Sequence, residues 1–138
     1  MQTQVANTAL PPIVLAEAEA DILADLAIAA RERSPLAAGL LLQEIERAST
    51  AGTGKVPRDV VRMMSRVDFV DEDSAERHSV ELVYPKDADT DLHRISVLTP
   101  IGAALIGMRC GEAIEWVDLR GARRRLRIVE VAQAAAGD

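Results

Sequence analysis

The sequence predicts an α+β fold: a short N-terminal antiparallel helical hairpin, a coiled coil, followed by an antiparallel β-sheet domain with one short helix. Two observations lead to it. Apolar residues recur at helical spacing early in the chain, and short alternating segments separated by turn-forming residues fill the rest. We therefore divide the chain into a flexible leader at 1–14, a helical hairpin arm at 15–52 and a C-terminal domain at 53–138. The 138 residues, 49% of them hydrophobic, are enough for one core and an arm.

The leader and the hairpin follow from prolines and from apolar spacing. Pro11 and Pro12 exclude a regular helix at the end of the leader. The first helix carries one apolar stripe, made of Leu15, Ala18, Ile22, Leu26 and Ala29. Ser34 and Pro35 start a second helix, whose stripe is made of Ala37, Leu41, Ile45 and Ala48. Because the joint is so short, the helices should lie antiparallel, with the tip of the hairpin near Glu32.

The C-terminal domain is predicted from alternating segments. Those typical of strands are 66–70, 79–84, 95–98, 113–117 and 124–131. The densest local pattern lies between the third and the fourth of them. Thr99 is a good N-cap, Pro100 suits the first helical position, and Gly107 should end the helix that begins there.

That pattern also carries a resemblance to a known family. Residues 99–107 read Thr-Pro-Ile-Gly-Ala-Ala-Leu-Ile-Gly, which resembles the signature turn and helix in the C-terminal domain of the GreA/GreB transcript cleavage factors. Segments 57–67 and 82–85 resemble the Rnk branch of that family, the regulators of nucleoside diphosphate kinase. The resemblance covers nearly all of the chain after about Val14. It implies an FKBP-like fold for the C-terminal domain.

The resemblance implies a non-catalytic transcription regulator that binds RNA polymerase near its secondary channel and competes with Gre-type factors without transcript cleavage. Gre factors hold a catalytic magnesium ion with two carboxylates at the tip of a longer coiled coil. Here the tip offers only Glu32 between two arginines, a carboxylate better placed to pair with them than to hold a metal. We expect partner contacts at Thr99, Pro100, Ile101 and Gly102 in the signature turn, and at Arg31, Glu32 and Arg33 in the tip. Ile101 has a second possible role as a core residue.

Two other functions remain open. One is an adaptor that regulates the level or activity of nucleoside diphosphate kinase through protein contacts, without polymerase binding. The other is a cleavage factor that combines Glu32 with a carboxylate from elsewhere. Prolyl isomerase activity, which an FKBP-like fold suggests, is disfavoured because the one Phe, one Tyr and one Trp of the chain cannot line an aromatic pocket.

Composition limits the remaining classes. A net charge of −6 disfavours direct binding to nucleic acid. One basic cluster is an equally good candidate for an edge strand guarded against aggregation and for a protein contact; it comprises Arg120, Arg123, Arg124, Arg125 and Arg127. Cys110 is the only cysteine, so neither an intramolecular disulfide nor a cysteine zinc cage can form. We expect a cytoplasmic monomer with no membrane contact and no cofactor.

Overall fold

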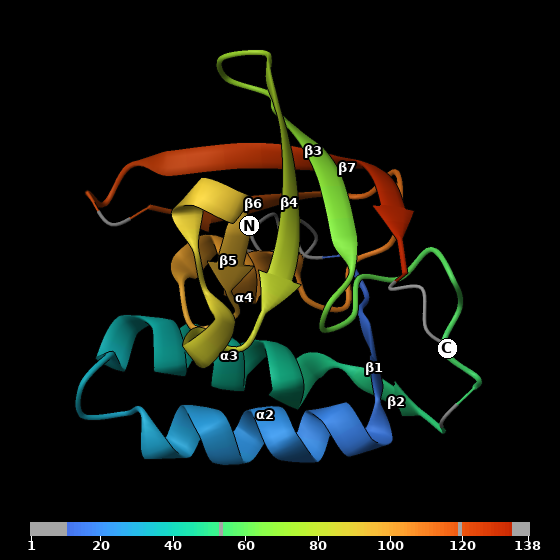
Figure 1. The fold of residues 1–138 in the computed structure, drawn as a ribbon, viewed down its shortest axis with the longest axis vertical. Coiled ribbons are helices and arrows are strands. Elements are labelled where there is room, and N and C mark those ends of the chain that lie inside the picture. The colour runs from blue at the N-terminus through green and yellow to red at the C-terminus, as the bar shows by residue number, and fades with distance from the viewer. Residues whose placement is uncertain (1–10, 53, 119, 134–138) are drawn as a thin grey trace, which may run out of the picture.

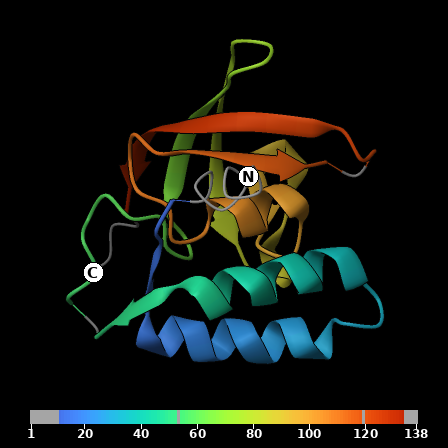
Figure 2. The same cartoon turned by 180° about the vertical axis from the view of Figure 1, so that it is seen from behind.

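The computed structural model describes residues 11–52, 54–118 and 120–133 and has an α+β fold (Figure 1). Two antiparallel helices, α2 (Glu17–Ala29) and α3 (Pro35–Arg47), lie at one end of the molecule. A five-stranded sheet in the order β5-β4-β3-β7-β6 forms the rest. Its strands are β3 (Arg66–Asp71), β4 (Glu76–Val83), β5 (Arg94–Ser96), β6 (Ala113–Val117) and β7 (Arg123–Ala132). The short helix α4 (Pro100–Leu105) lies between the helical hairpin and the sheet (Figure 2).

The two hairpin helices differ in how well their buried faces were predicted. In α3, Ala37 and Leu41 of the predicted stripe are buried, and Ile45 and Ala48 pack partly buried against the core. Ala38, which was not in the predicted stripe, is buried too. In α2 the prediction is wrong, because the buried residues are Ala20, Leu23 and Ala27. Leu15 precedes the helix, and three other members of the predicted stripe are exposed, namely Ala18, Ile22 and Ala29. The Ala-rich helix is apolar on more than one side, so spacing alone cannot select the face that packs.

A pair of very short parallel strands closes the base of the hairpin. Strand β1 (Val14–Ala16) leads into α2, and strand β2 (Ser49–Ala51) follows α3. In this pair, Leu15 lies opposite Thr50. Of the leader predicted at 1–14, residues 1–10 lie outside the described residues. Ile13 is buried and Val14 begins β1, so these two residues belong to the folded body.

The prediction of an antiparallel sheet is wrong at one edge. Strands β3, β4, β7 and β6 pair antiparallel, but β5 runs parallel to β4. Two 3-10 turns, η1 (Pro85–Asp87) and η2 (Thr90–Leu92), carry the chain back to the start of β5. The prolines and acids of this connection indicate a turn, but they do not tell a tight hairpin from a return crossover. The coiled-coil and FKBP-like descriptions stay predictions.

One hydrophobic cluster joins the helical hairpin to the sheet. It contains Leu23 of α2, Leu41 of α3, Leu105 of α4 and Leu126 of β7, all almost completely buried. The hairpin therefore lies along the body of the protein, and its packing face is part of the core. The predicted boundary between 52 and 53 stays a prediction, and the core runs across it.

An ion pair lies where the hairpin meets the sheet domain. The Nη2 group of Arg62 donates a hydrogen bond to Glu19 Oε2 of α2 at 3.2 Å. The Arg62 side chain is 32% exposed and the Glu19 side chain 18%. Glu19 Oε1 and Arg62 Nε are buried without a hydrogen-bond partner among the described residues. Burial, and then the nearby Glu19 carboxylate, raise the pKa of Tyr84 above its usual range. Each charge thus depends on the other for compensation.

No helix within the described ranges combines the length and the apolar character needed to cross a bilayer.

Removing one partner of this pair should destabilise the fold. In Arg62→Met the Glu19 carboxylate keeps its partly buried place without its cation, so we expect a loss of about 1–2 kcal/mol in the free energy of unfolding. Urea denaturation measures it. The control Arg66→Met changes an exposed arginine and should cost less than about 0.5 kcal/mol. Equal losses in the two variants would contradict this role for the pair.

Titration of the single tyrosine gives a second test of the surroundings of Glu19. Tyr84 is the only tyrosine, so tyrosinate absorbance reports its ionisation alone. Its pKa should lie above the ordinary value for tyrosine, and Glu19→Gln should lower it without restoring that value, because burial contributes more than the Glu19 charge. Since the folded state resists ionisation, this contribution to stability is present below the unfolded pKa and is lost as the pH rises through the folded one. An unchanged pKa in Glu19→Gln would contradict the assignment.

Candidate functional site

The signature turn is held by hydrogen bonds within its own sequence. Thr99 Oγ1 accepts a hydrogen bond from the Gly102 amide at 3.0 Å and caps α4 as predicted. The same hydroxyl donates to the Ser96 carbonyl oxygen at 2.8 Å. Ser96 Oγ in turn accepts from the Leu98 amide at 2.9 Å. The turn between β5 and α4 therefore has one well-defined conformation.

Gly102 is required by a close approach of the backbone. A Cβ placed there would lie 2.1 Å from the Ser96 carbonyl oxygen and 2.9 Å from both Thr99 Oγ1 and Val97 Cα. Gly102 and Pro100 are buried, whereas Thr99 and Ile101 remain partly exposed. If the turn contacts a partner, Thr99 and Ile101 offer it the accessible side chains. A partner role for all four residues stays a prediction.

A hollow of about 290 Å³ opens beside the signature turn. It is lined by Thr99, Pro100, Ile101, Trp116, Asp118 and Arg120. A second hollow of about 170 Å³ shares Pro100 and Trp116 with the first and extends to Leu40 and Glu44 of α3. Sequence reasoning did not find Trp116. The one available signal was that the single tryptophan of the chain stands in the strand that follows the signature helix.

The tip of the hairpin is exposed but lies close to the body. Arg31, Glu32 and Arg33 are all exposed in the turn between α2 and α3. A hollow of about 450 Å³ is lined by Arg33 and also by Ser96 and Leu98, which lead into the signature turn. The two predicted contact segments are therefore close to each other on one side of the molecule.

The tip offers few ligands to a metal ion. Glu32 is its single carboxylate, as the sequence predicts. Within residues 11–52, 54–118 and 120–133, no group of three or more His, Cys, Asp or Glu side chains is arranged to hold a metal. A metal at this tip would therefore need ligands from beyond the residues that the structure describes.

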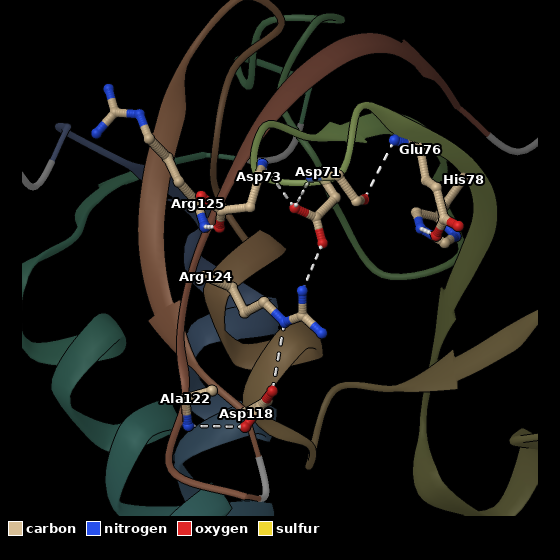
Figure 3. A network of polar contacts seen from close by, with 9 residues as sticks. Asp71, Asp73, Glu76, His78, Asp118, Ala122, Arg124 and Arg125 are labelled. Carbon is tan, nitrogen blue, oxygen red and sulfur yellow. Dashed lines mark hydrogen bonds and ion pairs between the residues drawn. The ribbon is translucent and has the colours of Figure 1, made fainter.

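The basic cluster is largely neutralised by internal ion pairs. Arg124 bridges Asp71 at 3.2 Å and Asp118 at 3.3 Å (Figure 3). Arg125 and Arg127 both bind Glu72, at 2.9 and 2.8 Å. These pairs tie the β3–β4 turn and the β6–β7 turn to β7 itself.

Contacts in this network lower the pKa values of two carboxyl groups. Hydrogen bonds from Arg127 and then Arg125 lower the pKa of Glu72. The pKa of Asp118 is also lowered, first by the Ala122 amide and then by the Arg120 amide and the Arg124 side chain.

The interpretation of the arginines as guards of an edge strand is wrong. Strand β7 is interior to the sheet, with β3 on one side and β6 on the other. Of the five arginines, Arg120 alone lacks a carboxylate partner within the described part of the chain, and it lines the hollow beside the signature turn. The cluster serves mainly to hold turns together.

Comparison with known proteins finds one family across most of the chain. The family described as "Transcription elongation factor, GreA/GreB, C-term" matches residues 56–133. The chain is similar to "Regulator of nucleoside diphosphate kinase" from Escherichia coli strain K12, with 37% identity over 73% of this chain and 76% of that protein. It is also similar to "Transcription elongation factor GreA" from Azorhizobium caulinodans, with 35% identity over 88% of this chain and 82% of that protein.

A solved structure gives the same result in three dimensions. The structure titled "Prokaryotic transcription elongation factor GreA/GreB from Nitrosomonas europaea" superposes with a TM-score of 0.69 and 38% sequence identity. The match covers 87% of this chain and 98% of that one. It therefore includes the helical hairpin as well as the sheet.

Two glycines test the packing of the signature turn. Gly102→Ala should cost at least about 2–3 kcal/mol of unfolding free energy, because its new methyl group meets backbone atoms that cannot move aside. Gly39→Ala, inside α3 with no atom within 4 Å of the new carbon, should instead add about 0.5–1 kcal/mol. Thermal and urea denaturation of both variants measure the difference. A neutral Gly102→Ala would contradict the required close approach.

Proposed function

The chain belongs to the GreA/GreB family of transcription elongation factors, and from this membership we propose that it is a non-catalytic regulator of RNA polymerase. It binds the polymerase near the secondary channel and competes with Gre-type factors without cleaving the transcript. The observation that carries the proposal is the hairpin tip, where one carboxylate stands between two arginines. The related regulators and elongation factors make transcription the process to test first.

The signature turn supplies the first contact of this proposal. It is rigid before any partner arrives, so little conformational entropy is lost on docking. Thr99 and Ile101 stand partly exposed beside the hollow that Pro100 and Trp116 also line. A pre-formed apolar hollow with a few polar groups is the kind of surface that anchors a protein partner.

The hairpin tip supplies the second contact. Each hairpin helix has 13 residues and is therefore about 20 Å long, and the hairpin lies along the body rather than projecting from it. A tip with one carboxylate cannot supply the two ligands with which Gre factors hold magnesium. Bound at the same place, the chain blocks a cleavage factor by mass action, in proportion to its concentration and affinity.

The alternative function is an adaptor for nucleoside diphosphate kinase. Its support is the name of the Escherichia coli relative, which the chain matches over 73% of its length. An adaptor would bind the kinase directly and leave the polymerase unoccupied. Deleting the hairpin is a poor way to separate the two, because Leu23 and Leu41 belong to the common core. Alanine at Arg31, Glu32 and Arg33 together changes the exposed tip without touching that core.

The proposal predicts displaceable binding to purified RNA polymerase with no transcript cleavage. Ile101→Arg should weaken the affinity about tenfold, because it places a charge on the partly exposed face of the signature turn. The control Leu92→Arg alters a residue that is 55% exposed in η2 and should leave the affinity unchanged. Fluorescence anisotropy with a labelled chain measures both, with a cleavage-competent Gre factor as competitor.

Other outcomes of the same titration reject the proposal. No polymerase binding at micromolar concentration would reject it, and binding to purified nucleoside diphosphate kinase in its place would establish the adaptor. Magnesium-dependent shortening of a backtracked transcript that Glu32→Ala abolishes would show that the chain is a cleavage factor.

A further inference from the structure

Helix α2 has an outward face that no described element covers. Figures 1 and 2 show α2 at the outer edge of the molecule, with α3 beside it and no described element beyond it. Its exposed residues recur at intervals of three and four, so they lie together on one side of the helix. They are Glu17, Ala18, Asp21, Ile22, Asp25, Ile28 and Ala29.

Apolar side chains gather on this outward face. Ile22 and Ile28 are each 52% exposed, and Leu36, in the first turn of α3, is 50% exposed. These three residues of the hairpin are among the five large hydrophobic side chains that are exposed in the described part of the chain. The alanines of the face, Ala18 and Ala29, are small enough to let a second helix approach closely. Exposed apolar residues that gather in this way indicate a contact surface.

The charges along the outer side of the hairpin change sign from one end to the other. Asp21 and Asp25 lie within α2, whereas Arg31 and Arg33 lie beyond its end, in the tip. All four side chains are exposed, and none of them forms an ion pair with a residue that the structure describes. The two aspartates stand one turn apart and repel each other mildly, so a cation from a second molecule stabilises them.

We infer that two copies of the chain associate through this face, with their α2 helices antiparallel. A two-fold axis across the face sets the two aspartates of each copy beside the two tip arginines of the other copy. The exposed isoleucines of the two copies then lie between these charged ends. One patch therefore supplies both halves of the contact, and the charges set its orientation. The sequence predicts a monomer, and this inference replaces that expectation.

The size of the face indicates a weak, reversible dimer. Helix α2 has 13 residues and is about 20 Å long. A contact along one such helix is smaller than the interfaces of stable complexes, which bury about 1,200–2,000 Å². We therefore expect a dissociation constant on the order of 10–100 μM. The charged contacts are exposed to solvent, so the constant should rise with salt concentration.

The dimer covers the tip that the proposed function assigns to the polymerase. Because Arg31 and Arg33 cannot contact both partners at once, self-association limits the amount of chain that has a free tip. This consequence alone rests on the proposed function. Self-association itself is measured without polymerase, so its failure is distinguishable from failure of the proposed function.

Sedimentation equilibrium of the full chain tests the association directly. The concentration is varied from about 5 μM to about 1 mM, a range that brackets the expected constant. The weight-average mass should rise from the 14.9 kDa of one chain towards twice that value. A mass that stays at one chain throughout this range would overturn the inference.

A pair of polar variants tests the apolar part of the face. Ile22→Gln should raise the dissociation constant of the dimer about tenfold, because it removes an apolar side chain from the contact. Leu92→Gln makes a matching change at a residue that is 55% exposed in η2, away from the face, and should leave the constant unchanged. Equal constants in the two variants would place the contact elsewhere and overturn the inference.

A charge swap tests the antiparallel arrangement. One variant combines Asp21→Lys with Asp25→Lys, and the other combines Arg31→Glu with Arg33→Glu. Each variant alone brings like charges together across the two-fold axis, so its own dimer should be weakened about tenfold or more at low salt. An equimolar mixture should restore the original constant within about twofold, because both contacts of the mixed dimer again join opposite charges.

The control for the swap changes charge on the sheet. Glu76→Lys combined with Glu130→Lys makes the same change in net charge at exposed positions of β4 and β7, and it should leave the dimer unchanged. A mixture of the two swapped variants that associates no more tightly than either alone would overturn the antiparallel arrangement. Equal weakening by the control would show that net charge, rather than this face, governs association, and would overturn it as well.

Discussion

The apolar contact between the helical hairpin and α4 is the constraint on which the rest of the structure depends. Leu23 and Leu41 meet Leu105 in a single buried cluster. On its other side α4 is fixed against β5 by the close approach of Gly102 to Ser96. The orientation of the hairpin, the conformation of the signature turn and the walls beside Trp116 are therefore set together. Changes to the core of the hairpin will be felt at the turn, although the two are far apart in sequence.

Features governed by neighbours in sequence could be predicted. The Thr99 cap, the start of α4 at Pro100 and its end before Gly107 depend on interactions within a few residues. Strand β6 has the predicted bounds, because β-branched and aromatic residues alternate between two turns. The position of Glu32 in an exposed tip follows equally from the short joint between two helices.

Features governed by contacts between residues far apart in the sequence could not be predicted. The buried face of α2 is chosen by α3 and α4, and an Ala-rich helix offers more than one apolar side. The parallel pairing of β5 and the interior place of β7 are properties of the whole sheet, since an interior strand and an edge strand can share one alternating pattern. The smaller hollow beside the signature turn is lined by α3, α4 and β6 together, which is why Trp116 had no visible role before the fold was known.

The pairing of β1 with β2 has a consequence for how such hairpins can diverge. The strands clasp the two ends of the hairpin at its base, at the opposite end from the tip. Residues inserted equally into both helices near Arg31 would lengthen the hairpin by about 1.5 Å per added pair and leave clasp and core untouched. The length of the hairpin can thus change during evolution while the rest of the fold stays the same. Selection can therefore alter how far the tip extends without altering the core.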